Sequence, residues 1–236
     1  MIREFAIVLI LLMLYNEYEV NNMKRKLMLR YLIFLVGIFL MGLGISMNVK
    51  SGLGTTPISC VPLLLSKILP FSFGTMAFFF SIFFIFIEWL ILRKDFKKEH
   101  YSQLIVTPFF GFFIDFGMFL LRDINLETYM EKMLILLLAC LLIALGIYFQ
   151  VIAKVLINSA EGLVYVIAEK TKIRFGNVKI MFDSSLVVLG IIISLLAFGK
   201  IQDIGEGTII VAIALGSLVK VYKKIFDWIG IDWLYK

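Results

Sequence analysis

The chain has 236 residues, of which 61% are hydrophobic and 17% are charged, and its mean hydropathy is +1.00. A soluble domain carries about a quarter charged residues, and a single core buries only part of so much apolar surface. The composition therefore excludes a water-soluble fold and predicts the lipid bilayer as the solvent. The net charge of +6 is concentrated in short connecting segments, which is typical of cytoplasmic loops and disfavours nucleic-acid binding.

The first 22 residues contain a short apolar run that does not reach the length of a membrane span. No small-residue cleavage site follows the run, so a secretory signal is not predicted. Glu19-Val20 can be encoded by a ribosome-binding sequence placed just before Met23. Met1 and Met23 are therefore alternative starts, and residues 1–22 are interpreted as an over-extended gene model or an interfacial helix.

Five apolar segments approach the roughly 20 residues that cross a bilayer, and a sixth is weaker. The five are Tyr31–Val49, Phe73–Leu92, Leu104–Leu121, Met133–Ala153 and Phe175–Phe198, and the sixth is Thr208–Val221. Two further segments, Thr55–Leu69 and Asn158–Lys170, are apolar but broken by polar or helix-unfriendly residues. We expect them to be full spans, re-entrant half-helices or interfacial helices.

An internal repeat links the two halves of the chain. A shift of 102 residues aligns Gly44 with Gly146 and Gly74 with Gly176, and it brings the two broken segments to matching places. If the broken segments do not cross, each half has three crossings, and the odd number inverts the second half. The basic connections then all lie in the cytoplasm, and the acidic connections lie outside.

We therefore predict an all-α, polytopic transmembrane helical bundle with internal duplication in an inverted three-plus-three arrangement. Each half contains one broken or re-entrant segment. The predicted parts are a first membrane repeat over residues 23–122, a second over 123–224, and an interfacial amphipathic tail over 225–236. Trp228, Trp233 and Tyr235 suggest the anchoring of this tail.

Residues 42–57, GLGISMNVKSGLGTTP, resemble the first helix and Pro-marked segment of the YczE/YyaS/YitT group of bacterial membrane proteins. Agreement continues at residues 73–75, 111–115 and 205–208, so the resemblance extends over about residues 27–224. In the second half, the family's Gly-x-Gly-Pro turn followed by Asp is replaced by a stretch that keeps a carboxylate, Glu161, without the turn. The resemblance implies a membrane location and a duplication, and it names no substrate.

Several polar side chains inside the apolar segments are candidates for a solute pathway, because such groups need partners, water or a function in lipid. Lys179 and Asp183 are four residues apart and share a helical face, and Glu161 begins the second broken segment. Asn48 and Gln150 occupy matching places in the repeat. The structural alternatives are an internal ion pair that stabilises the fold, an interfacial carboxylate, and amides that serve helix packing.

Asp115 is a further pathway candidate, since it lies well within an apolar span. In a register that pairs Gly111 with Gly216, its counterpart is Lys220. The Asp115 and Lys220 side chains either meet or occupy separate half-sites. In the alternative interpretation, both charges lie near helix ends and extend to the lipid headgroups. Glu88, one turn from Arg93, is interpreted as interfacial.

Gly52, Gly54 and Pro57 are predicted to form a tight structural turn into the first broken segment, and an anion site at a helix N-terminus is the alternative. His100 is the only histidine and lies in a basic loop, while Cys60 and Cys140 lie in apolar stretches. Nucleotide-binding and nucleophile motifs are missing from the sequence. We therefore expect no enzyme activity, no cofactor and no metal site.

The sequence thus favours a bacterial cytoplasmic (inner) membrane transporter or permease for a small solute, with the lipid bilayer as its partner. The alternative is a membrane scaffold that stabilises a larger complex and transports nothing. The scaffold predicts fully packed polar residues, and the transporter predicts a cavity between the two halves. The solute, the coupling ion and the oligomeric state are not predicted by the sequence.

Overall fold

The structure is a computed structural model that describes residues 23–96 and 98–229. These residues form helices joined by short connections, which confirms the all-α prediction. The helices are α2 (Met23–Ser51), α3 (Pro57–Ile68), α4 (Phe73–Leu92), α5 (Lys98–Leu120), α6 (Tyr129–Ala153), α7 (Ser159–Thr171), α8 (Phe175–Phe198) and α9 (Glu206–Ile229), with a 3₁₀ turn, η2, at Arg93–Asp95. The predicted extension at residues 1–22 and the tail residues Trp233 and Tyr235 lie outside the described residues.

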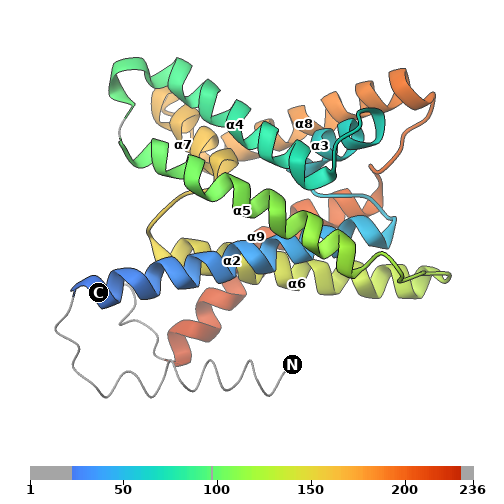
Figure 1. The fold of residues 1–236 in the computed structure, drawn as a ribbon, viewed down its shortest axis with the longest axis horizontal. Coiled ribbons are helices and arrows are strands. Elements are labelled where there is room, and N and C mark those ends of the chain that lie inside the picture. Colours follow the sequence, from blue (N-terminus) through green and yellow to red (C-terminus); the bar gives the residue numbers. More distant parts are fainter. Residues whose placement is uncertain (1–22, 97, 230–236) are drawn as a thin grey trace.

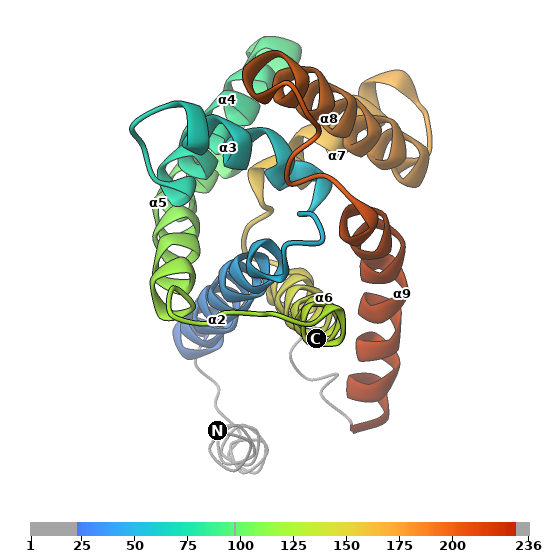
Figure 2. The ribbon, with the colours of Figure 1, turned by 90° about the vertical axis from the view of Figure 1, so that its right-hand side faces the viewer.

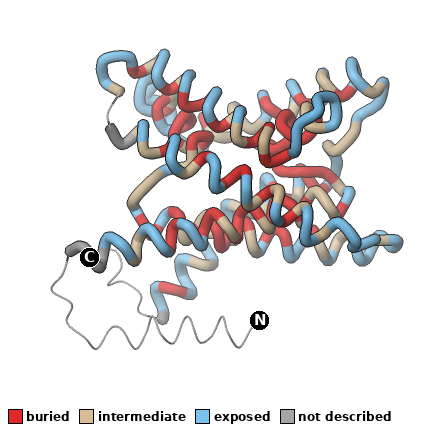
Figure 3. Tube along the Cα trace, viewed as in Figure 1, coloured by how far each residue is buried: buried red, intermediate tan, exposed pale blue. Residues whose placement is uncertain are grey.

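Five helical segments of the described chain are long and apolar enough to cross a membrane, which confirms a multi-pass membrane protein. They are Leu27–Ser51, Phe73–Asp95, His100–Leu120, Tyr129–Ala153 and Phe175–Phe198. Their outward faces carry large apolar side chains, and the buried positions lie along the inward faces (Figure 3). The weaker predicted span, Thr208–Val221, lies in α9, which is not one of the five.

The two broken segments form the short helices α3 and α7, of 12 and 13 residues. At 1.5 Å per residue they are about 18–20 Å long, whereas the hydrocarbon layer is about 30 Å thick. In Figure 1, α2 ends and α4 begins at one end of the molecule, while α6 ends and α8 begins at the opposite end. Each short helix is therefore too short to span the hydrocarbon layer, and the chain returns through it to the end of the molecule from which it came.

Helices α2 and α6 lie side by side and run in opposite directions through the core of the molecule (Figure 1). Glycines allow their backbones to approach closely at two places. A Cβ atom at Gly37 would lie 2.8 Å from the Gly146 carbonyl oxygen, and one at Gly44 would lie 3.1 Å from the Ala139 carbonyl oxygen. Helix α5 packs on α2 and helix α9 on α6, so that α5 and α9 flank the central pair (Figure 2).

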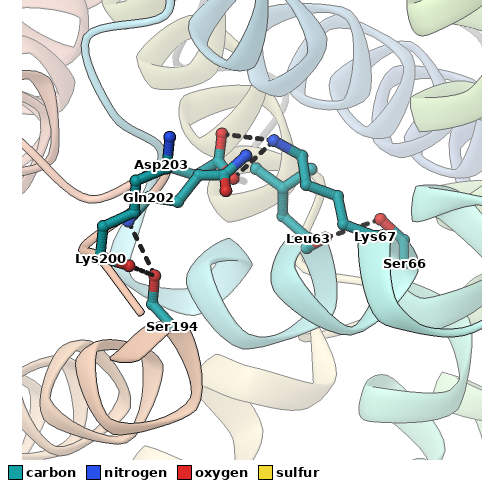
Figure 4. A network of polar contacts seen from close by, with 7 residues as sticks. All are labelled: Leu63, Ser66, Lys67, Ser194, Lys200, Gln202 and Asp203. Atoms are coloured by element: carbon teal, nitrogen blue, oxygen red, sulfur yellow. Dashed lines mark hydrogen bonds and ion pairs between the residues drawn. The ribbon is translucent and has the colours of Figure 1, made fainter. Parts of the chain in front are cut away.

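Each short helix packs against a long helix of the other half of the chain: α3 against α8, and α7 against α4. Ion pairs reinforce both contacts. Lys67, at the end of α3, reaches Asp203 in the α8–α9 connection at 2.6 Å, and the two side chains point toward one another in Figure 4. Lys170, at the end of α7, reaches Asp95 in the α4–α5 connection at 3.0 Å. The two halves are therefore interlocked.

The two halves differ in how their last two long helices pack. Helices α4 and α5 meet at Gly74 and Gly111, where a Cβ atom at Gly111 would lie 2.5 Å from the Gly74 carbonyl oxygen. Gly176 in α8 and Gly216 in α9, which the predicted repeat aligns with these glycines, have open space where a Cβ would be. The first half thus has a close helix pair that the second half does not reproduce.

Candidate functional site: a polar cavity at the start of α7

A small cavity lies inside the molecule where α7 begins, with walls from α2, α4, α5 and α6. Its polar lining is Ser81, Gln103, Thr107, Gln150, Asn158 and Ser159, and its apolar lining is Ile38, Val106, Phe110 and Ile157. It offers about 10 Å³ to the centre of a water molecule, which is the room that one water needs. A cavity with several polar side chains in its wall, within an apolar bundle, is a place where a polar molecule or ion can be held.

The sequence around residue 158 places the N-terminus of α7 at this cavity. Helix α6 ends at Ala153, and its C-cap residue Lys154 is left-handed, with a φ of 49°. The chain then runs to Asn158, the extended N-cap residue of α7. The Asn158 side chain makes no capping hydrogen bond to the helix. The N–H groups of the first turn of a helix have no acceptor within the helix, and the N-terminus carries the positive end of the helix dipole. The part of the cavity wall at residues 158–159 therefore favours the binding of a hydrogen-bond acceptor.

Beside the cavity, α4 and α5 bury a carboxylate. Glu88 is 0% exposed, and its Oε2 faces His100 Nδ1 at 2.9 Å and accepts a hydrogen bond from Gln103 Nε2 at 3.3 Å. Neither Glu88 Oε1 nor Gln103 Oε1 has a hydrogen-bond partner among the described residues. The α7 backbone closes this cluster, because a Cβ atom at Gly162 would lie 2.5 Å from Glu88 Oε1. Gln103 thus donates a hydrogen bond to the Glu88 carboxylate and also forms part of the cavity wall.

A second charged cluster lies on the opposite side of α7, toward α8. Lys179 Nζ is 2.9 Å from Asp183 Oδ1 and 3.9 Å from Glu161 Oε1. The three side chains are about a quarter exposed, and Glu161 Oε2 has no hydrogen-bond partner among the described residues. The structure thus brings together three of the candidates predicted from the sequence. Two carboxylates share one ammonium group there.

The equivalent region at the start of α3 is closed by hydrogen bonds. In the amide orientation that satisfies both groups, Asn48 donates to the Gly54 carbonyl oxygen at 3.2 Å and accepts from Thr56 N at 3.1 Å. Thr208 of α9 accepts a hydrogen bond from Thr55 N at 3.2 Å. The turn has φ angles of +69° at Gly52 and +132° at Gly54, and Pro57 is the first residue of α3.

The remaining candidates have local partners. Asp115 accepts hydrogen bonds from Gly74 N at 2.7 Å and from the Ser72 hydroxyl at 2.5 Å, at the N-terminus of α4. It lies apart from the Glu161 cluster, while Lys220 is exposed on α9. Gln150 lines the cavity and also donates to the Gly146 carbonyl oxygen at 3.3 Å.

Sequence reasoning missed the Glu88 cluster, because Glu88 was interpreted as interfacial and His100 as part of a solvated loop. A signal for Glu88 was present in the sequence. Ser81, Ile85 and Glu88 recur at intervals of four and three residues, which places them on one face of α4, and that face is buried. Among the described residues, no three His, Cys, Asp or Glu side chains form a group that could hold a metal ion.

Comparison with known proteins agrees with the expected resemblance. A family model described as a family of unknown function (DUF6198) matches residues 28–224. The chain belongs to the DUF6198 family. It is also 26% identical to the uncharacterized protein YyaS of Bacillus subtilis (strain 168) over 201 residues, which cover 84% of this chain and 94% of that protein. No solved structure matches the chain. The match to the DUF6198 family includes the whole cavity lining and both charged clusters.

Proposed function

We propose that this DUF6198 protein is a transporter of a small solute in the bacterial cytoplasmic membrane. The observation that carries the proposal is the internal polar cavity at the start of α7, lined by side chains of four long helices and one short helix. Secondary transporters bind their solutes at the interface of repeats, where broken helices present their termini. A scaffold without transport would not require polar side chains of α4, α5, α6 and α7 to converge on one cavity.

The proposed architecture is an inverted duplication, with α2–α5 as the first half and α6–α9 as the second. The contacts support a two-fold relation. The shift of 102 residues aligns Gly37 with residue 139 and Gly44 with Gly146. The close contact between Gly37 and Gly146 therefore becomes, when the two halves are exchanged, the close contact between Ala139 and Gly44. The same exchange relates α3–α8 packing to α7–α4 packing. On this proposal α9 is the sixth crossing, and the basic connections face the cytoplasm.

The cavity as described has room for one water, so transport requires the helices around it to separate. Helices α8 and α9 do not interlock at Gly176 and Gly216, where an added Cβ atom would meet nothing within 4 Å. In the proposed cycle, α7 and its partner α4 move relative to the α2–α6 pair and open the cavity to one side at a time.

The test is uptake into proteoliposomes of a defined mixture of amino acids, sugars, nucleosides and organic acids, measured by mass spectrometry. The wild-type protein is expected to accumulate at least one compound above the level of protein-free liposomes. Ser159→Phe fills the cavity and should abolish that uptake, whereas Ser185→Phe, on an exposed face of α8, should leave it unchanged. Uptake by Ser159→Phe at the wild-type rate would exclude this cavity from the pathway.

A further inference from the structure

The Glu88 cluster has the features of a proton-binding site, and neither its carboxylate nor its histidine was among the pathway candidates. Glu88 is completely buried within a membrane-spanning helix, and a charged carboxylate in such a place needs full compensation. Its two hydrogen-bonding partners, His100 and Gln103, both contact Oε2. Oε1 has none among the described residues, so the compensation is incomplete.

The tight packing around Glu88 Oε1 leaves room for a bound proton but not for a metal ion. The backbone of α7 packs directly on this oxygen at Gly162, and the neighbouring cavity is not lined by Glu88. A metal ion needs several ligands and a cage to hold it, whereas a proton needs no volume. The site can therefore change its charge without any change in packing.

His100 provides the route by which a proton reaches Glu88. Its Nδ1 atom faces Glu88 Oε2, and its side chain is 21% exposed, between the buried carboxylate and the molecular surface. A proton taken up at Nε2 gives an imidazolium, and transfer of the Nδ1 proton to Glu88 Oε2 leaves a neutral imidazole and a carboxylic acid. The charge is conserved in the transfer, and the reverse steps release the proton.

The surroundings contain few other charges that act on Glu88. Helix α5 contributes His100 and the neutral Gln103, and α7 contributes Gly162. The adjacent Glu161 pairs with Lys179 of α8 on the other side of α7. Among the described titratable groups, His100 is the one that lies at hydrogen-bond distance from Glu88.

We propose that Glu88 binds and releases a proton through His100, and that Gln103 transmits this change to the cavity at the start of α7. When Glu88 is a carboxylate, it holds the Gln103 amide by Nε2. When Glu88 is protonated, that charge-assisted hydrogen bond weakens and the amide in the cavity wall is released. The coupling of this proton to solute movement rests on the transport function proposed above, whereas the proton site itself does not.

The test uses the full chain in lipid nanodiscs with Cys60→Ala and Cys140→Ala, and it needs no solute. Asn158→Cys reports on the cavity by its labelling rate with a methanethiosulfonate reagent, and Lys200→Cys, on an exposed connection, corrects for the pH dependence of the thiol. Acidification should change the corrected rate about fivefold or more, which is the usual range for coupled sites. Glu88→Gln should abolish this change, and the control Glu169→Gln, at an exposed position of α7, should retain it.

A second variant guards against misfolding of Glu88→Gln. Gln103→Met keeps the carboxylate and the side-chain length but removes the amide, so it should also make the corrected rate independent of pH. A wild-type rate that ignores pH, a Glu88→Gln rate that follows pH as the wild type does, or a response to Na⁺ at constant pH would each overturn the proposal. Absence of solute uptake with a normal labelling response would reject the transport function alone.

Discussion

The close contact of α4 and α5 allows the packing of the two halves to be compared by matched substitutions. Gly111→Ala places a Cβ atom 2.5 Å from the Gly74 carbonyl oxygen, about 0.9 Å short of an ordinary 3.4 Å contact. The obstructing atom belongs to a backbone and cannot rotate away. The helices must separate, and this movement also stretches the hydrogen bonds from Ser72 and Gly74 to Asp115.

The expected cost follows from these two effects. Overpacking of this kind destabilises proteins by about 1–3 kcal/mol, and hydrogen bonds to a charged group contribute about 1.5–3 kcal/mol. The gain in helix propensity from Gly to Ala returns up to about 1 kcal/mol. We expect Gly111→Ala to lower the free energy of unfolding by about 2–4 kcal/mol. Gly216→Ala meets no atom within 4 Å and should be neutral or slightly stabilising.

Unfolding in mixed detergent and SDS, followed by circular dichroism, measures both variants under one set of conditions. The pair serves as its own control, since both variants make the same substitution within a long helix and differ in whether a neighbouring helix obstructs the new Cβ atom. A difference below about 0.5 kcal/mol between Gly111→Ala and Gly216→Ala would refute the interpretation that α4 and α5 are locked at this point.

The same unfolding assay checks two further predictions. Asn48→Ala should lower the free energy of unfolding by about 1–3 kcal/mol, because it leaves Thr56 N buried without an acceptor. Gln150→Ala should lower it less, because the Gly146 carbonyl retains its helical hydrogen bond. Equal losses in the two variants would contradict this prediction. Lys179→Met should destabilise by about 1–3 kcal/mol, because two partly buried carboxylates lose their shared cation, and adding Asp183→Asn should restore most of the loss. A double variant no more stable than Lys179→Met would contradict the ion-pair assignment.

The long helices were the most predictable part of the fold, because hydropathy alone defines them. The predicted spans Phe73–Leu92 and Phe175–Phe198 coincide with α4 and α8. The predicted span Met133–Ala153 starts later than α6, which begins at Tyr129. The earlier start has a local cause: Thr128 and Glu131 form a capping box, a pattern that is visible in the sequence but lies outside the apolar run.

The candidate site was less predictable, because its members meet through tertiary contacts. The Lys179–Asp183 pair follows from helical spacing, but the partners of Asp115 lie on the neighbouring helix, and no local pattern indicates them. The Glu88–His100 contact joins α4 to α5 across their connection. The many charged residues of that connection led to its interpretation as a basic loop, so the contact was not predicted. Hydropathy reports how apolar a segment is, but it does not say which face of the helix meets another helix.

The interlocking of the halves has a consequence for how the protein is made. Helix α3 leaves the ribosome long before α8, the helix on which it packs, because residues 69–174 are synthesised in between. Until then, the Thr55 N–H lacks its acceptor on Thr208 and Lys67 lacks its partner Asp203. The docking of α3 must therefore wait until α8 and the α8–α9 connection have been made. A chain cut between α5 and α6 would yield two inserted but unfinished fragments, each holding a short helix whose main packing partner lies in the other fragment.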